Sequence, residues 1–180
     1  MLGSHRLFQK MCMYQESVKV PLHLRLPKGL HHAGQAIRQT ISHIDVLPTL
    51  CHYLGLEPGQ GMEGRSLHTL MEQGCPEEPL SRPVFIQYDG NSCLSGYQRC
   101  VIDGSLKLIM DVFQKETFFE LYSTADDPEE TTNLLFEDGY TQNGARLFTL
   151  LCEHMARTGD SLVCPTDAYE HFTDSASLPH

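Results

Sequence analysis

The side chains that could do chemistry in this chain are its seven cysteines, its ten histidines and one cluster of acidic residues. A thiolate is a nucleophile and a metal ligand, and an imidazole transfers protons or binds metals near neutral pH. His31 and His32, with His23 nearby, form the densest histidine group. Neighbouring residues do not present two imidazoles on one face, and no carboxylate or cysteine stands at ligand spacing beside them. We therefore interpret these histidines as solvated loop residues.

The acidic cluster consists of Asp126, Asp127, Glu129 and Glu130, and its carboxylates could together hold a cation. Residues 127–133 are instead typical of a turn that leads into a helix, where the helix dipole favours acidic side chains. We predict this structural role for the cluster.

The seven cysteines stand at irregular spacings in a chain long enough to fold without covalent cross-links. We therefore expect mostly reduced thiols rather than a disulfide framework. No apolar stretch of a secretory signal follows Met1, so the sequence as printed predicts a cytoplasmic location. If Met1 is not the true start, a signal upstream would escape this prediction.

The charge balance argues against several kinds of partner. The net charge is −10 and the 13 Lys and Arg residues are scattered, whereas nucleic acids and anionic membrane surfaces require clustered cations. No apolar stretch approaches the roughly 20 residues that a membrane-spanning helix needs. We expect neither a nucleic acid nor a membrane as a partner.

Periodicity predicts the elements that position these residues. Residues 18–26 alternate apolar and polar side chains, which indicates a strand, and Pro21 suits an edge position in it. This strand has no partner nearby in the sequence, and its exposed edge would allow self-association. Ser42 predicts the cap of a helix that has Pro48 in its first turn and ends at Gly55.

The second half of the chain predicts a small antiparallel sheet. Asp103 and Gly104 are a strong hairpin signal between two of its strands. An apolar stripe predicts a C-terminal helix of about 15 residues that Gly159 ends. The fold class is therefore α+β, with helices on one face of the sheet. The predicted strands cover residues 84–88, 98–102, 106–110 and 118–122, the stripe consists of Leu147, Leu150, Leu151 and Met155, and a short helical turn is expected at 66–71.

Six segments, in order, resemble the type I sulfatase family of the alkaline-phosphatase-like superfamily, which includes choline-sulfatase-like and arylsulfatase-like proteins. Each pattern is short, but six in the family's order are hard to obtain by chance. The segments are residues 1–10 (MLGSHRLFQK), 14–22 (YQESVKVPL), 42–50 (SHIDVLPTL), 64–67 (GRSL), 103–109 (DGSLKLI) and 120–134 (ELY through DPEETTNL).

The resemblance implies a division of the chain. Residues 1–30 would be the C-terminal remnant of the large α/β domain of a sulfatase. Residues 31–160 would be the smaller C-terminal subdomain, with a four-stranded antiparallel sheet and a terminal helix. Residues 161–180 would form a flexible tail.

The resemblance also implies a chemistry. The family hydrolyses sulfate esters with a formylglycine, made from the Cys or Ser of a Cys/Ser-x-Pro-x-Arg motif, and with a divalent cation, usually Ca²⁺. No cysteine here begins that motif, since Cys75 and Cys164 have proline one position too early and lack the arginine. The early Asp-Asp metal pair is absent, and the late Asp-His-Gly would precede Met1. We therefore expect no metal or cofactor in this chain.

One residue of the family's site is expected here. Lys10 stands where the family has a lysine that contacts the sulfate and neutralises developing charge, and in this chain alone we expect it to face solvent. His5 is either a residue near that pocket or a structural histidine. Residues 88–92 follow a strand where relatives approach the substrate, and they form either a substrate contact or a plain turn.

The sequence thus predicts the C-terminal segment of a sulfuric ester hydrolase that is inactive alone. A sulfate-ester substrate would bind only if the N-terminal half is supplied. Three alternatives remain: a non-catalytic interaction module, a subunit completed by a separately encoded N-terminal half, and a fragment of a related phosphonate or phosphate monoester hydrolase. The substrate is not predicted, because the residues that select it lie mostly in the missing part.

Overall fold

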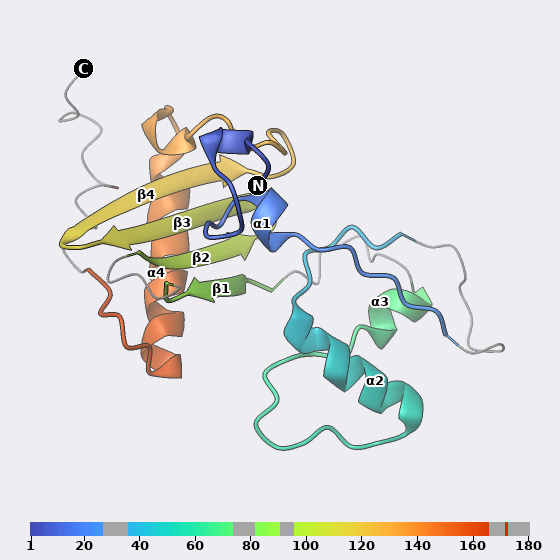
Figure 1. Cartoon of the computed structure of the whole chain (residues 1–180). Coiled ribbons are helices and arrows are strands. Elements are labelled where there is room, and N and C mark those ends of the chain that lie inside the picture. The colour runs from blue at the N-terminus through green and yellow to red at the C-terminus, as the bar shows by residue number, and fades with distance from the viewer. Residues whose placement is uncertain (27–35, 74–81, 91–95, 166–171, 173–180) are drawn as a thin grey trace. The chain divides into compact units, whose positions relative to one another are not determined.

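The computed structural model describes residues 1–26, 36–73, 82–90, 96–165 and 172. The chain divides into two compact units. Unit 1 consists of Met1–Val20 and Phe85–His180, and unit 2 of Pro21–Val84. Figure 1 labels the helices and strands of both units.

Unit 1 is built on a four-stranded sheet in which each strand neighbours the next one along the chain. β2 pairs antiparallel with β3, and β3 with β4. Asp103 faces Leu106 across the first of these hairpins, so Gly104 and Ser105 make a two-residue turn, and Gly104 takes the positive φ of 62° that such turns require. The predicted antiparallel sheet is confirmed. Its strands are β1 (Val84–Tyr88), β2 (Tyr97–Asp103), β3 (Leu106–Phe113) and β4 (Glu116–Ser123).

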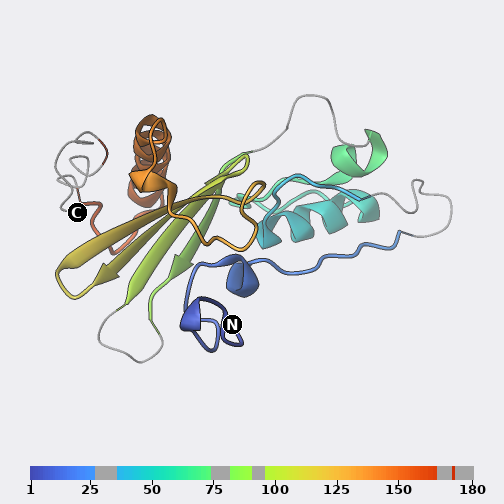
Figure 2. The ribbon, with the colours of Figure 1, turned by 90° about the horizontal axis from the view of Figure 1, so that it is seen from above.

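The C-terminal helix α4, Thr141–Thr158, covers one face of this sheet (Figures 1 and 2). Its inward residues meet every second residue of the strands, because side chains alternate between the two faces of a strand. Gly159, at a φ of 66°, ends the helix as predicted. The cluster that results is the main core, and it includes Val101, Leu108, Met110, Phe119, Leu121, Leu147, Phe148, Leu151 and Met155.

The N-terminal segment covers the opposite face of the sheet (Figure 2). It contains a short 3-10 turn, Ser4–Arg6, and the one-turn helix α1, Gln15–Val18. Met13 of this segment packs in a second, smaller cluster with the strand residues that point away from α4, which are Cys100, Ile102, Ile109 and Tyr122. The sheet is therefore covered on both faces.

The predicted strand at residues 18–26 is wrong. Val18 ends α1, and residues 19–26 have no regular secondary structure. Alternating side chains are not sufficient for a strand, because its backbone must also pair with a neighbour. Within the described ranges no neighbouring strand pairs with this segment.

Unit 2 contains a 3-10 turn (His43–Asp45), α2 (Val46–Leu54) and α3 (His68–Gln73). Both helices and the end of α2 at Gly55 agree with the sequence patterns. The buried Asp45 carboxylate holds the unit together, since it accepts hydrogen bonds from the backbone N–H of Ser42 and Arg65, both at 2.9 Å, and pairs with Arg82. A Cβ on Gly64 would lie 1.8 Å from the Ile44 oxygen, so only glycine allows this approach.

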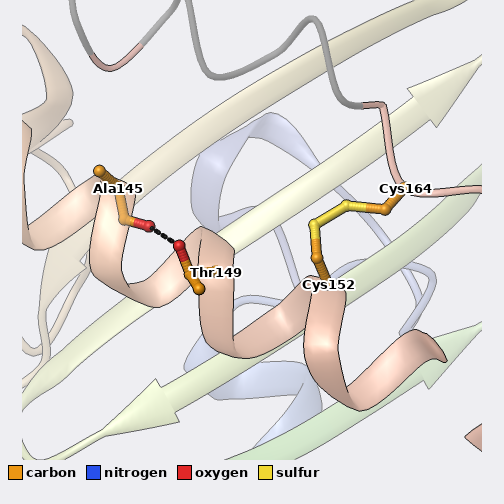
Figure 3. Close-up of a disulfide and its surroundings, with 4 residues drawn as sticks. All are labelled: Ala145, Thr149, Cys152 and Cys164. Carbon is orange, nitrogen blue, oxygen red and sulfur yellow. Dashed lines mark hydrogen bonds between the residues drawn. A yellow bond between two sulfur atoms is a disulfide. The ribbon is translucent and has the colours of Figure 1, made fainter. Parts of the chain in front are cut away.

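A disulfide joins Cys152 of α4 to Cys164 (Figure 3). This pair is an exception to the expected mostly reduced thiols, because the turn at Gly159 carries the chain back along the helix, which irregular cysteine spacing does not reveal. Cys12, Cys51 and Cys100 are free and buried. Phe172 packs beside Phe119 and Phe148, with ring centroids 5.2 and 5.3 Å away. Cys164 and Phe172, two residues of the predicted tail, therefore pack on the core.

We expect this disulfide to stabilise unit 1. The chain-entropy model assigns about 3 kcal/mol to a loop of this size. Circular dichroism during urea unfolding should therefore show a lower midpoint for the wild type after reduction with dithiothreitol. The Cys164→Ser variant should unfold like the reduced wild type and should not respond to dithiothreitol. An unchanged wild-type midpoint on reduction would contradict this prediction.

Candidate functional site

The N-terminal loop, residues 1–10, carries both predicted site residues. Its ends are held together by hydrogen bonds, from the Met1 ammonium to the Gln9 oxygen at 2.8 Å and from the Gly3 N–H to the Leu7 oxygen at 3.0 Å. His5 and Gln9 have positive φ angles of 53° and 73°, as does Arg6, which non-glycine residues adopt rarely. Such backbone persists only where the surrounding contacts impose it.

His5 makes two contacts with residues outside this loop, Tyr14 and Glu129. Its ring stacks on Tyr14, with centroids 3.9 Å apart and planes inclined by 3°. Its Nε2 lies 2.9 Å from the backbone oxygen of Glu129. A carbonyl oxygen only accepts hydrogen bonds, so this contact assigns the proton to Nε2. These contacts anchor the loop. Whether His5 also lies near a sulfate pocket stays a prediction.

Lys10 lies at the end of the same loop with an exposed side chain, as expected for this chain alone. No described acidic residue forms an ion pair with it. An exposed lysine is a positive charge that an anion can approach. Whether it contacts a sulfate stays a prediction.

Lys107 and Glu130 form an ion pair that sequence reasoning missed. The Lys107 Nζ lies 2.6 Å from Glu130 Oε1, and both side chains are 0 % exposed. The other carboxylate oxygen accepts a hydrogen bond of 2.7 Å from the backbone N–H of Gln15, where α1 begins. The pair therefore ties the loop after β4 and the N-terminal segment to the sheet. The available signal was a lysine inside the apolar run of residues 106–110, since lysine is almost never buried without a partner.

Two tyrosines beside this ion pair share one carboxylate. Glu120 accepts hydrogen bonds from the Tyr14 hydroxyl at 3.2 Å and from the Tyr122 hydroxyl at 3.1 Å. Burial, followed by the negative charge of Glu120, raises the pKa of both phenols above the ordinary value. Both phenols therefore stay protonated near neutral pH and donate hydrogen bonds rather than act as bases.

Asp127 of the acidic cluster at 126–130 supports a turn, as predicted, but the turn leads to a three-residue 3-10 helix, Leu134–Phe136, and not to an α-helix. Asp127 accepts hydrogen bonds from the backbone N–H groups of Thr131 at 2.7 Å and Thr132 at 2.9 Å. These donors, Thr132 first, lower the pKa of the Asp127 carboxyl. Glu130 differs from the prediction, because it pairs with Lys107 inside the protein instead of lying at a helix N-terminus.

Arg99 of β2 forms ion pairs with two carboxylates, those of Asp89 and Asp160. Its guanidinium, 2 % exposed, pairs through two nitrogens with both oxygens of Asp160, at 2.6 and 2.7 Å, and with Asp89 at 2.7 Å. Asp89 belongs to the predicted loop 88–92 and is held by this ion pair, and whether the loop contacts a substrate stays a prediction. Residues 91 and 92 lie outside the described part of the chain.

The described residues offer little to nucleophilic or metal chemistry. No three His, Cys, Asp or Glu residues of the described ranges lie where they could hold a metal ion. Burial raises the pKa of the Cys100 thiol to about 12, which keeps it from forming a thiolate. His23 is exposed, and His31 and His32 lie outside the described residues. In the same ranges, no helix has the length and apolarity of a membrane span.

Comparison with known proteins identifies the family of this chain. The family model of the N-sulphoglucosamine sulphohydrolase C-terminal domain matches residues 3–157. An uncharacterized sulfatase of Escherichia coli, YidJ, is 25% identical over 167 residues, which are 89% of this chain and 31% of YidJ. The chain thus spans about a third of the length of this curated relative.

Solved structures show the same fold. One, in complex with its substrate D-glucosamine-2-N,6-O-disulfate, has a TM-score of 0.69 and 25% identity, and covers 92% of this chain and 34% of the other. The phosphonate monoester hydrolase of Agrobacterium radiobacter has a TM-score of 0.53 and 25% identity, over 69% of this chain and 27% of that one. The fold is that of the C-terminal part of alkaline-phosphatase-like sulfatases. The chain belongs to the N-sulphoglucosamine sulphohydrolase C-terminal domain family.

Glu130→Gln should destabilise unit 1 strongly, because it leaves the Lys107 ammonium buried without a counter-charge. Loss of one partner of a buried pair costs about 3–5 kcal/mol. The free energy of unfolding in urea, followed by circular dichroism, measures this cost. Glu129→Gln, at the exposed neighbouring position, is the matched control and should change it by less than about 0.5 kcal/mol. Equal midpoints for the two variants would refute a stabilising role for the pair.

Asp160 should make stability depend on pH. The hydrogen bond from Arg99 lowers the pKa of its carboxyl in the folded state. A lowered folded-state pKa stabilises the protein above the unfolded value of about 4, and this contribution disappears as the pH falls through the folded value. Asp160→Asn should therefore lower the urea midpoint at pH 7, and its difference from wild type should shrink below about pH 4. Asp138→Asn, at an exposed position, is the control. A constant difference at all pH values would contradict the assignment.

Proposed function

We propose that this chain supplies the C-terminal part of a sulfuric ester hydrolase and does not hydrolyse sulfate esters alone. The observation that carries this proposal is a family match over residues 3–157 in a chain whose cysteines begin no Cys/Ser-x-Pro-x-Arg motif. The chain also spans 31% of the sulfatase YidJ. In this proposal the nucleophile and the metal ligands belong to the other two-thirds of the fold.

Lys10 is the residue of this chain that we propose to touch the substrate. Its exposed ammonium would neutralise negative charge on the sulfate oxygens once the rest of the site is present. His5 would act on Lys10 only indirectly, since its stacking on Tyr14 and its contact with Glu129 hold the loop that carries the lysine. We therefore assign His5 a positioning role.

The family's formylglycine and Ca²⁺ do not fit the residues described here. The described ranges hold no group of metal ligands, and the free thiols are buried. No step of the reaction is therefore assigned to this chain beyond charge neutralisation by Lys10 and support of its loop.

The substrate class of the complete protein is proposed from structural similarity. The structural relative with a TM-score of 0.69 binds D-glucosamine-2-N,6-O-disulfate as its substrate, which favours a sulfated amino sugar. A second candidate is hydrolysis of phosphonate or phosphate monoesters. It is favoured by the phosphonate monoester hydrolase of Agrobacterium radiobacter, which shares the fold at the same 25% identity.

The disulfide is informative about the cellular compartment of the protein. Disulfides persist in oxidising compartments and are rare in the cytosol. The bond between Cys152 and Cys164 therefore favours an oxidising compartment over the cytoplasmic location that the sequence as printed predicts.

The purified chain should not hydrolyse p-nitrophenyl sulfate, an aryl sulfate whose product is measured by absorbance. Wild type and Lys10→Ala should show the same background rate, because neither contains a nucleophile. A metal-supplemented assay should give the same result. Turnover by the wild type above that of Lys10→Ala would refute the proposal. Release of p-nitrophenol from a phosphonate monoester, but not from the sulfate, would favour the second candidate.

A further inference from the structure

The disulfide between Cys152 and Cys164 closes a ring that contains a buried carboxylate. The two cysteines stand 12 positions apart, and the ring includes the end of α4, the turn that follows it, and Asp160. The backbone N–H of Asp160 donates to the Met155 oxygen at 2.9 Å, and its Oδ1 accepts from the Leu162 N–H at 2.9 Å. The disulfide therefore joins the segment that carries Asp160 to the helix (Figure 3).

The Asp160 carboxylate connects this ring to the sheet through Arg99 of β2. Arg99 Nε and Nη2 donate to its two oxygens at 2.6 and 2.7 Å. The same guanidinium holds the end of β1, since its Nη1 donates to the Tyr88 oxygen at 3.2 Å and its Nη2 pairs with Asp89 at 2.7 Å. A guanidinium is planar and rigid, so the two bonds to Asp160 orient the nitrogens that bind residues 88 and 89. Direct contacts thus run from the ring to the loop after β1.

The helix and the segment after it depend on the disulfide to different extents. α4 is fixed by its buried core residues and by His154, whose ring stacks on Phe85 of β1 with centroids 3.8 Å apart. Residues 160–165 contain no helix or strand. Loss of the disulfide returns conformational freedom to this segment, and that freedom opposes the ordered pairing of Asp160 with Arg99. We expect the effect to reach this ion pair while the helix and the sheet stay folded.

The disulfide is open to thiol exchange. Cys152 and Cys164 are partly exposed, whereas the free thiols of Cys12, Cys51 and Cys100 are buried. Oxidation forms the bond between the two Sγ atoms, and the two protons and two electrons lost by the thiols pass to a small disulfide, such as oxidised glutathione, which becomes two thiols. Reduction by a dithiol runs in the opposite direction.

We propose that this disulfide is a redox-sensitive switch for residues 88–90, the described part of the loop after β1. In the oxidised protein, Asp160 is held beside α4 and orients Arg99, which fixes the loop. In the reduced protein, Asp160 leaves Arg99, and the loop loses its fixed position. The inference goes beyond the proposed function, because it concerns the conformation of a loop and requires no hydrolysis of a sulfate ester.

Nuclear magnetic resonance of the full 180-residue chain tests this proposal, because chemical shifts report on the folded state. Reduction with dithiothreitol should shift the amide signals of residues 88–90. It should also remove the Arg99 Nε–H signal, which the bond to Asp160 protects from exchange with water. The signals of β4, at the opposite edge of the sheet, should not move. The double variant Cys152→Ser/Cys164→Ser should give the reduced spectrum without dithiothreitol.

A second measurement uses the reciprocity of coupled sites. If the disulfide favours the pairing of Asp160 with Arg99, that pairing must also favour the disulfide. Asp160→Asn should therefore lower the ratio of reduced to oxidised dithiothreitol that half-reduces the bond, by about fivefold or more. Alkylation with N-ethylmaleimide and mass spectrometry of the Cys152 peptide measures this ratio. Glu153→Gln, which removes an exposed carboxylate beside Cys152, is the matched control and should leave the ratio unchanged.

Three outcomes would overturn the switch. These are amide signals of residues 88–90 that do not respond to reduction, equal shifts along all four strands, and the same half-reduction ratio for wild type and Asp160→Asn. Unchanged β4 signals confirm that Asp160→Asn is folded. If this variant does not fold, the spectrum of the double cysteine variant decides, because an oxidised-type spectrum from it would refute the proposal.

Discussion

The buried pair of Lys107 and Glu130 is the interaction on which the described site depends. Each charge is 0 % exposed, so neither could remain in the protein without the other. The second oxygen of Glu130 reaches the start of α1, and its neighbour Glu129 receives His5. One ion pair on β3 thus connects the sheet, the loop after β4 and the N-terminal segment. The position of the loop that carries Lys10 follows from this connection.

The two faces of the sheet serve different purposes. The face under α4 is closed by aromatic and aliphatic side chains and by the disulfide at Cys152, and its contacts are those of an ordinary core. The other face combines a small apolar cluster with the tyrosine hydroxyls on Glu120 and the ion pair at Lys107. Polar contacts are directional, whereas apolar packing is not. The second face is therefore the one able to hold a loop in a fixed conformation.

Unit 2 uses the same principle with Asp45, whose carboxylate unites residues that stand far apart in the sequence. These hydrogen bonds give a structural reason for the two family patterns at 42–50 and 64–67. The first pattern supplies the acceptor, Asp45, and the second supplies Gly64, which packs against Ile44, and the backbone N–H of Arg65, which donates to Asp45. The family resemblance seen in the sequence thus has a physical basis in contacts that only certain residues can make.

The sequence by itself determined the four strands, the hairpin at Gly104, helices α2 and α4 and the family, because these depend on local periodicity, turn chemistry and short motifs. The tertiary structure alone decided the roles of Glu130, Cys164 and residues 18–26. Glu130 depends on a lysine 23 positions away, Cys164 on the turn that brings it back to α4, and a strand on a neighbour to pair with. Local patterns carry no information about such distant partners, which is why the Glu130 carboxylate, expected near a helix end, lies buried beside Lys107 of β3 instead.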